Sequence, residues 1–403
     1  MPAGYWRSVG MQNKLPSSLA ITGQILGVVF YTFLGFLCIG IPIAVVPGFV
    51  HNELGFGVAI AGLTIASQYL ATLLTRPLAG KAADNLGTKR AVVLGLTGIA
   101  ISGALTLLST ELAHLPLLSL SIMLLARVLL GVTQGLLGVS TISWGINQVG
   151  VEHTARVISW NGIAAYGAIA IGAPVGVLMV EAWGFSTLGI ALMLLALLGL
   201  LLVYKRTPAP IIKGERMPFS AVLGRIAPYG LGLALGSIGY GTLTTFVALY
   251  FASKGWSGAA YSLSAFGVAF IATRILGIDA IKRYGGYSVA IACMSIESLG
   301  LLLLWLAPSP LWAMAGAALT GIGLSLVYPA LGVEAIKQVP DSSRSAGFSA
   351  YAVFFDLALA TAGPLMGCVA YAVGYNGIFF AAALLAVGGV SLSLWLARRA
   401  RGI

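Results

Sequence analysis

The sequence contains few charged residues, few histidines and few cysteines. Only 8% of its 403 residues are charged, against about 25% in a soluble domain, whose surface must be solvated. Most of the surface of the folded chain must therefore face something other than water. Cys38, Cys293 and Cys368 show no metal-ligand spacing, and an odd number of cysteines argues against a disulfide framework. We interpret all three as small core residues.

Signatures of several protein classes are missing as well. His51, His114 and His153 fall in predicted loops or at membrane edges, and no Ser/His/Asp, metal or cofactor constellation surrounds them. The absence of a GxxxxGK[ST] loop excludes an ATP-driven pump within this chain. The net charge of +11 occurs in small groups and not in a basic domain. The sequence thus predicts no enzyme, no metal, no cofactor and no nucleic-acid partner, and its longest polar segment is too short for a signalling domain.

Long apolar segments are what the chain has in abundance, with 59% hydrophobic residues and a mean hydropathy of +0.99. A membrane-spanning helix needs roughly 20 apolar residues. We predict twelve such helices, near residues 22–49, 56–79, 91–110, 115–146, 156–182, 185–204, 227–252, 258–280, 287–306, 311–336, 346–372 and 375–397. The expected fold is all-α, with a six-helix half at 1–204, a polar connector at 205–225 and a second six-helix half at 226–403.

The lysines and arginines predict the orientation of the chain in the membrane. All 22 except Lys254 and Arg127 fall on the side that carries the N-terminus and the connector. Positive residues accumulate on the cytoplasmic side of membrane proteins. We therefore expect both termini in the cytoplasm.

The two halves also resemble each other. Two pairs of segments align: RPLAGKAADNLGTKR (76–90) with RILGIDAIKRYGGYS (274–288), and SWNGIAAYGAIAIGAP (159–174) with SAYAVFFDLALATAGP (349–364). The first pair places Arg76 on Arg274. Lys282 takes the place of Asp84, so the second loop should not form the same contact as the first. Two related halves with a binding site between them are typical of secondary transporters that work by rocking.

The segment GKAADNLGTKR (80–90) resembles the cytoplasmic loop motif of the major facilitator superfamily. Gly80 permits close helix approach, Asp84 can hold a helix N-terminus or a basic partner, and Gly87 allows a tight turn. The predicted cytoplasmic gate consists of Gly80, Asp84, Gly87, Lys89 and Arg90. The alternative is an ordinary solvated turn. Asn85 and Thr88 stand where the family usually has basic residues, which predicts a thinner charge network.

A second resemblance lies in GAIAIGAPVG (167–176), which is similar to the fifth-helix motif of the family's antiporters. Gly167, Gly172 and Gly176 are expected to let helices approach closely, and Pro174 to bend the helix. Generic small-residue packing is the alternative. This motif is the sequence feature that favours export over uptake.

Charged residues inside the predicted spans are candidates for proton coupling, because such charges are costly and usually face a partner or water. The candidates are Asp356, Glu297, Glu334 and Arg127. Arg127 opens RVLLGVTQG (127–135), which resembles the family's fourth-helix arginine motif and so implies proton coupling; otherwise it is clamped to backbone carbonyls. Asp356 is the strongest candidate, since helix eleven flanks the cavity in the family. Glu297 is expected to cap a helix contact, because helix nine is peripheral there.

Polar and aromatic residues on the expected cavity helices are candidates for substrate contact, although each alone is better explained by packing or by anchoring at the membrane interface. They are Tyr31, Gln68, Tyr69, Trp144, Asn147, Asn161, Tyr166, Tyr240, Thr244 and Tyr328. Aromatic and amide groups in an apolar cavity suit a neutral or amphiphilic solute.

Beyond the superfamily, the chain resembles the YhhS/YfcJ-type bacterial efflux permeases. The resemblance is carried by GIPIAVVPGFVH (40–51), SQYLATLLTRPLAGKAAD (67–84), RVISWNGIAAYGA (156–168) and SLVYPALGVEAIK (325–337). It implies a monomeric, twelve-helix permease of the bacterial inner membrane whose partners are lipid, protons and a small molecule. Our leading hypothesis is proton-coupled export of a sugar-like or drug-like solute. The runner-up is a proton symporter that imports a sugar, nucleoside or organic acid. A third hypothesis, from a different functional class, is a membrane-embedded sensor or enzyme.

Overall fold

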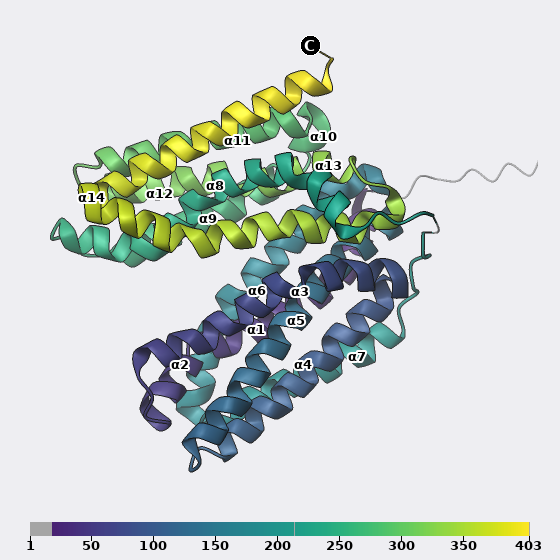
Figure 1. Ribbon diagram of the computed structural model, residues 1–403, viewed down its shortest axis with the longest axis vertical. Coiled ribbons are helices and arrows are strands. Elements are labelled where there is room, and N and C mark those ends of the chain that lie inside the picture. The colour runs from purple at the N-terminus through teal and green to yellow at the C-terminus, as the bar shows by residue number, and fades with distance from the viewer. Residues whose placement is uncertain (1–17, 213, 403) are drawn as a thin grey trace, which may run out of the picture.

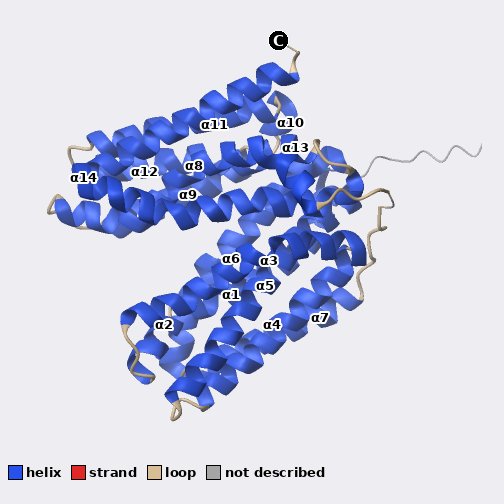
Figure 2. Ribbon diagram, viewed as in Figure 1, coloured by secondary structure: helices blue, strands red, loops and turns tan. Residues whose placement is uncertain are grey.

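A computed structural model describes residues 18–212 and 214–402, and these residues are almost entirely helical (Figure 2). No β-strand occurs within the described ranges. Arg7, Lys14 and Lys213, which entered the orientation prediction, lie outside them, as does the N-terminus itself.

The first half contains six long helices, as the sequence predicts. They are α1 (Ser18–Ile43), α3 (Val58–Leu86), α4 (Thr88–Glu111), α5 (Pro116–Val149), α6 (Thr154–Trp183) and α7 (Ser186–Tyr204). Short helical turns lie between them: α2 (Val46–Gly48), η1 (Phe49–Glu53) and η2 (Val151–His153). Pro116 begins α5, where its missing N–H costs no helical hydrogen bond.

The second half repeats this arrangement with two interruptions. Its elements are α8 (Phe219–Ser253), α9 (Ala259–Leu276), α10 (Ala280–Tyr284), α11 (Gly286–Leu306), α12 (Pro310–Ser325), α13 (Val327–Ile336), η3 (Asp341–Ser343) and α14 (Arg344–Ala400). Consecutive α12 and α13 together cover the tenth predicted span. Gly374 has a positive φ of 78° and divides α14 into the eleventh and twelfth spans. The helix α8 begins inside the range 205–225 predicted for the connector, which leaves the described residues among 205–218 outside helices.

The described helices are suited to a membrane. Nine of them are long and apolar enough to cross one, and the last of these, Asp341–Ala400, is long enough for two crossings. Large apolar side chains are exposed around the bundle, among them Leu63, Leu74, Leu117, Leu194 and Leu201. An exposed apolar surface of this extent fits contact with lipid. Together with α3 and α9, which are not among the nine, these helices account for twelve spans. The prediction of an all-α membrane protein with twelve spans is confirmed.

The turns that follow α3 and α10 confirm the relation between the halves. Gly87 and Gly285, which occupy aligned positions, have φ and ψ of 87° and 148°, and of 83° and 154°. A residue with a Cβ rarely adopts this conformation. Glycine therefore permits the same turn in both halves.

Each half has its own hydrophobic core, and the two halves lie side by side only toward one end (Figure 1). We call the end at which residues 205–218 join the halves the connector end, and the opposite end the loop end. A third, smaller cluster joins the halves, since Phe348 of α14 packs with Ile25, Val157 and Ile158 of the first half. Toward the loop end the halves diverge.

Candidate transport site and connector-end contacts

The predicted gate residue Asp84 joins the two halves at the connector end. Its Oδ1 accepts a hydrogen bond from the backbone N–H of Ser345 and its Oδ2 from that of Ala346, both at 3.0 Å. These N–H groups belong to the first turn of α14, where the helix dipole also favours a negative charge. Arg216 of the connector donates to the backbone carbonyl of Asp84. The sequence predicted a helix N-terminus or a basic residue as the partner of this aspartate, and its carboxylate binds the helix N-terminus.

Gly80 brings the backbones of α3 and α14 together one turn earlier. A Cβ at this position would lie 2.7 Å from Cα of Ala346 and 2.9 Å from Cβ of Ser349. Ser349 donates its hydroxyl hydrogen to the carbonyl of Arg76. Only glycine fits this approach without displacing α14.

Two residues predicted for the gate do not contact the other half. Lys89 donates to the carbonyls of Tyr204 at 3.1 Å and Arg206 at 2.6 Å, and so ties α4 to the end of α7. Arg90 is exposed, with no hydrogen bond or ion pair to any described residue. The predicted gate is therefore reduced to Gly80, Asp84 and the turn at Gly87.

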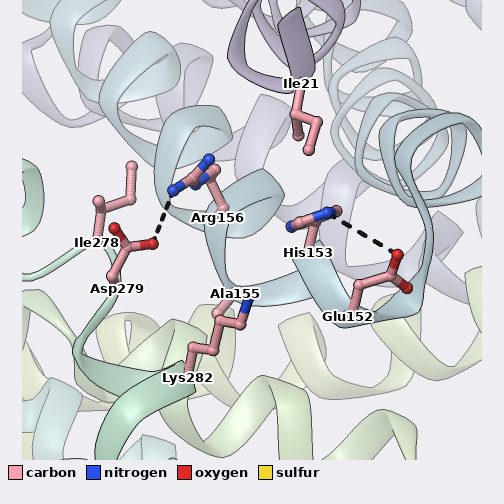
Figure 3. Close-up of a pocket in the computed structure, with 8 residues that line it drawn as sticks. All are labelled: Ile21, Glu152, His153, Ala155, Arg156, Ile278, Asp279 and Lys282. Atoms are coloured by element: carbon pink, nitrogen blue, oxygen red, sulfur yellow. Dashed lines mark hydrogen bonds and ion pairs between the residues drawn. The ribbon is translucent and has the colours of Figure 1, made fainter. Parts of the chain in front are cut away.

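The second half forms its own contact by a different route. Asp279 lies three residues before Lys282, and its carboxylate pairs with Arg156 of α6 at 2.8 Å (Figure 3). Extending the alignment of the halves upstream places Arg156 on Ala346. Where the first contact uses a backbone N–H of α14, the second uses a side chain of α6. The prediction that Lys282 cannot form the contact of Asp84 is consistent with this geometry. The sequence did not indicate that Asp279, three residues earlier, would supply a carboxylate instead.

A pocket of about 240 Å³ lies beside this second contact. Figure 3 shows Arg156, Asp279 and Lys282 on one side of it and His153 with Glu152 on the other. It lies at the connector end, and none of its lining residues is among those predicted for the substrate cavity.

Asn147 belongs to the connector end as well, which corrects its place among the cavity candidates. Its Oδ1 accepts a hydrogen bond from Nη1 of Arg344, whose Nη2 pairs with Asp341. Since Arg344 begins α14, this contact adds to the one made by Asp84. Ser345 and Ser143 also join α14 to α5, with hydroxyl oxygens 2.9 Å apart.

The strongest predicted proton-coupling residue, Asp356, forms an ion pair across the halves. Its Oδ2 lies 2.8 Å from Nη2 and 2.9 Å from Nε of Arg76 on α3. Arg76 precedes Asp84 by about two helical turns, so this pair lies deeper in the bundle than the gate. The side chains are 11% exposed for Arg76 and 24% for Asp356, so solvent reaches the pair. The sequence places Arg76 at the start of the loop segment 76–90 and does not predict this partnership.

Arg274, which aligns with Arg76, makes the corresponding crossing from the second half. Its Nε donates to the carbonyl of Ser325 at 3.0 Å, and its guanidinium lies 4.7 Å from the centre of the Phe270 ring. Its Nη1 is directed at Gly162 of α6, where a Cβ would overlap it. Tyr166, one turn further along α6, is in edge contact with Phe270 at 5.6 Å.

Several tyrosines surround these two arginines. Phe270 also stacks with Phe266, which stacks on Tyr240 with ring centres 5.1 Å apart. Tyr328 is in edge contact with Phe355, the neighbour of Asp356, and Tyr69 lies about two turns before Arg76 on α3. We call the group the central cluster: Tyr69, Arg76, Tyr166, Tyr240, Arg274, Tyr328 and Asp356. Tyr69 is 44% exposed and Tyr166, Tyr240 and Tyr328 are half-buried, so the tyrosines of the cluster are accessible. Thr244 is also exposed, one turn beyond Tyr240, and its hydroxyl donates to the Tyr240 carbonyl.

Four other cavity candidates are buried inside the first half. Tyr31 stacks on Trp144 with ring centres 5.9 Å apart. Gln68 donates to Gln134 at 3.1 Å, and Asn161 accepts hydrogen bonds from Thr32 and Thr141. All four are at most 7% exposed. In this conformation they hold α1, α3, α5 and α6 together and do not line a surface open to solute.

The remaining coupling candidates stay within their own halves. Arg127 is fully buried and its Nη2 lies 3.3 Å from Oγ1 of Thr106, while its Nε and Nη1 have no partner among the described residues. Glu297 is fully buried against Gly239 and Gly323, and neither carboxyl oxygen has a partner in the described part of the chain. Glu334 pairs with Lys337 one turn away at 2.9 Å. None of the three reaches the central cluster through a described contact.

Twelve helices in two repeated halves, joined by ion pairs and helix-terminus contacts, define a membrane transporter fold. The family model of the Major Facilitator Superfamily matches residues 28–286 and 229–402. The chain belongs to this superfamily and is a secondary transporter.

Relatives and solved structures agree with this assignment. An uncharacterized MFS-type transporter of Pseudomonas aeruginosa is 54% identical over 381 residues, which cover 94% of this chain and 95% of the relative. One of Burkholderia mallei is 51% identical over 383 residues, covering 95% and 94%. The Escherichia coli fucose:proton symporter superposes with a TM-score of 0.76 at 17% identity, over 93% of this chain and 98% of that one. A bacterial homologue of ferroportin in an outward-facing state gives 0.78 at 13%, over 93% and 99%. At such identities these structures show the shared fold alone.

Proposed function

We propose that this chain is a proton-coupled exporter of a small organic solute that works by alternating access. The observation that supports this most strongly is the Arg76–Asp356 ion pair, which joins the two halves in a solvent-accessible place deep in the bundle. Protonation of Asp356 would remove its charge and release Arg76. A proton would thereby loosen a contact that holds the halves together at the connector end.

The arrangement of the halves fits one state of such a cycle. The gate at Asp84, the pair Arg156–Asp279 and the contact of Arg344 with Asn147 all lie at the connector end. If that end faces the cytoplasm, as the excess of positive residues predicts, the central cluster is open to the outside. We place both termini in the cytoplasm and the protein in the bacterial inner membrane, as a monomer.

Export is favoured by the antiporter-like motif on α6. A Cβ at Gly172 would lie 2.9 Å from the backbone nitrogen of Ile41, and Gly176 packs against the carbonyl of the same residue, so the motif brings α6 close to α1. Gly167 does not take part, since a Cβ there would have no neighbour within 4 Å. Pro174 lies inside α6, which continues through it as a helix.

The test uses proteoliposomes with an imposed pH gradient and an internal pH indicator. Varied solutes are added to wild type and to Asp356→Asn. We expect at least one solute to dissipate the gradient with wild type and none with the variant, which should still exchange that solute. Exchange without proton movement in wild type would replace the proposal with a facilitator or exchanger. If the pH gradient dissipates only when the solute moves inward with the protons, the alternative is favoured: a proton symporter that imports a sugar, nucleoside or organic acid.

A further inference from the structure

The central cluster contains two arginines and one carboxylate. The carboxylate of Asp356 is paired with Arg76. Arg274 has no carboxylate within ion-pair distance among the described residues, whose other ion pairs involve residues at the connector end. The cluster therefore carries one positive charge that the protein does not balance locally.

The partners of Arg274 stabilise its guanidinium without cancelling its charge. They are the carbonyl of Ser325 and the ring of Phe270, both neutral. Arg274 is only 2% exposed. A buried charge within a membrane protein is costly unless it has a counter-charge. Its retention beside an accessible group of tyrosines indicates a use for it.

The symmetry of the halves shows which group Arg274 lacks. Alignment of the fifth and eleventh spans places Tyr166 on Asp356, and Arg274 corresponds to Arg76. The side chain of Arg76 reaches α14 and pairs there with the carboxylate of Asp356. Arg274 reaches α6 at Gly162, one turn before Tyr166, and both Arg274 and Tyr166 contact the ring of Phe270. The position on α14 thus holds the carboxylate of Asp356, whereas the equivalent position on α6 holds the neutral hydroxyl of Tyr166.

We infer that the transported solute is an organic monoanion whose acidic group pairs with Arg274 in the place where the other half has Asp356. This inference rests on the proposed transport function and specifies its substrate class. The hydroxyl groups of Tyr166 and Tyr328 are suitable donors to a carboxylate oxygen, and the rings of the cluster suit the organic part of the solute. It replaces the neutral solute expected from the sequence.

The experiment measures binding to the purified full chain by concentration-dependent thermal stabilisation. Two matched pairs of probes separate charge from shape: benzoate with benzyl alcohol, and gluconate with glucose. We expect saturable stabilisation by the anion of at least one pair and none by its neutral partner. Equal binding of both members, or no saturable binding of either anion at millimolar concentrations, would overturn the inference.

Variants test the residue assignment in opposite directions. Arg274→Gln should weaken anion binding about tenfold or more, since a hydrogen-bonded charge partner is lost, and Arg274→Lys should restore part of it. Asp356→Asn should strengthen binding, because a like charge is removed, and no folding defect would produce tighter binding. Arg283→Gln, an exposed arginine of the same half, is the control. Unchanged anion affinity in Arg274→Gln would contradict the assignment.

Transport of the same probes separates the two proposals. If benzoate or gluconate binds through Arg274 but never crosses the membrane of proteoliposomes, the anion site stands and the transport proposal fails. If only the neutral members cross faster than they do in protein-free liposomes, the transport proposal stands and the monoanion inference fails.

Discussion

Asp84 and Asp356 both join the halves, and each carboxylate is stabilised by a different kind of partner. Asp84 accepts two backbone N–H groups at the start of α14, so its charge is favoured by hydrogen bonds and by the helix dipole. Asp356 is stabilised by a guanidinium, a charged partner that loses its counterion once the carboxylate is protonated. The first contact is suited to a gate and the second to a proton-dependent switch.

Asp84→Asn should slow transport more than it weakens binding. The amide keeps one acceptor oxygen but loses the charge that the start of α14 favours, which costs about 1 kcal/mol and shifts the balance of conformations about fivefold. We expect turnover of the solute found in the proteoliposome screen to fall severalfold while its Kd changes little. Glu111→Gln is the control, since Glu111 bonds to Ser186 within the first half. Unchanged turnover would mean that the loop is an ordinary turn.

Single residues were predictable from the sequence where a motif or a membrane-buried charge marked them. Asp84 and Gly80 were found from their spacing, and Asp356 was found as an acid inside a span. Arg76 was not recognised as its partner, because sequence does not show which residues of two distant helices meet. Tyr31, Trp144 and Asn161 have the composition of a binding surface, yet packing within the first half buries them.

Among the elements, α3 and α14 carry both contacts, and Gly80 determines how closely these helices pack. Gly80→Ala would place a Cβ 2.7 Å from Cα of Ala346, and such overpacking costs about 1–3 kcal/mol. We expect the connector end to open more often, so that Ser143→Cys, normally buried there, reacts severalfold faster with a soluble maleimide once the native cysteines are replaced.

The matched control for this experiment is Gly138→Ala on α5, where a Cβ would meet nothing within 4 Å. This change should leave the labelling rate of Ser143→Cys unaltered, because alanine favours a helix and creates no clash. Equal labelling rates in the two alanine variants would show that the close approach at Gly80 does not hold the connector end shut.

The helices themselves were largely predictable, since a membrane requires long apolar segments and polar residues mark their ends. The break at Gly374, between the eleventh and twelfth spans, was also anticipated in its position. The interruption between α12 and α13 was not, because neither a charged residue nor a glycine lies at the junction Ser325–Val327. Nor was the third cluster of apolar residues, which depends on the packing of Phe348 against the first half.

For the whole molecule, sequence similarity between the halves predicted a two-part architecture but not its conformation. The state seen here depends on several contacts at one end, and the balance between two packings of the same helices is a small free-energy difference. The similarity did reveal, once the structure was available, that Arg76 and Arg274 make equivalent crossings with unequal partners.

The central claim is that the Arg76–Asp356 pair holds the connector end closed until Asp356 loses its charge. Distances between spin labels test it directly, with one pair at the connector end (Leu86→Cys with Arg283→Cys) and one at the loop end (Trp183→Cys with Tyr371→Cys), all exposed positions. Each pair is measured with and without Asp356→Asn, in a background without the native cysteines. We predict that this neutralisation lengthens the connector-end distance and shortens the loop-end distance. If neither distance changes, the ion pair does not control the conformation and the account is contradicted.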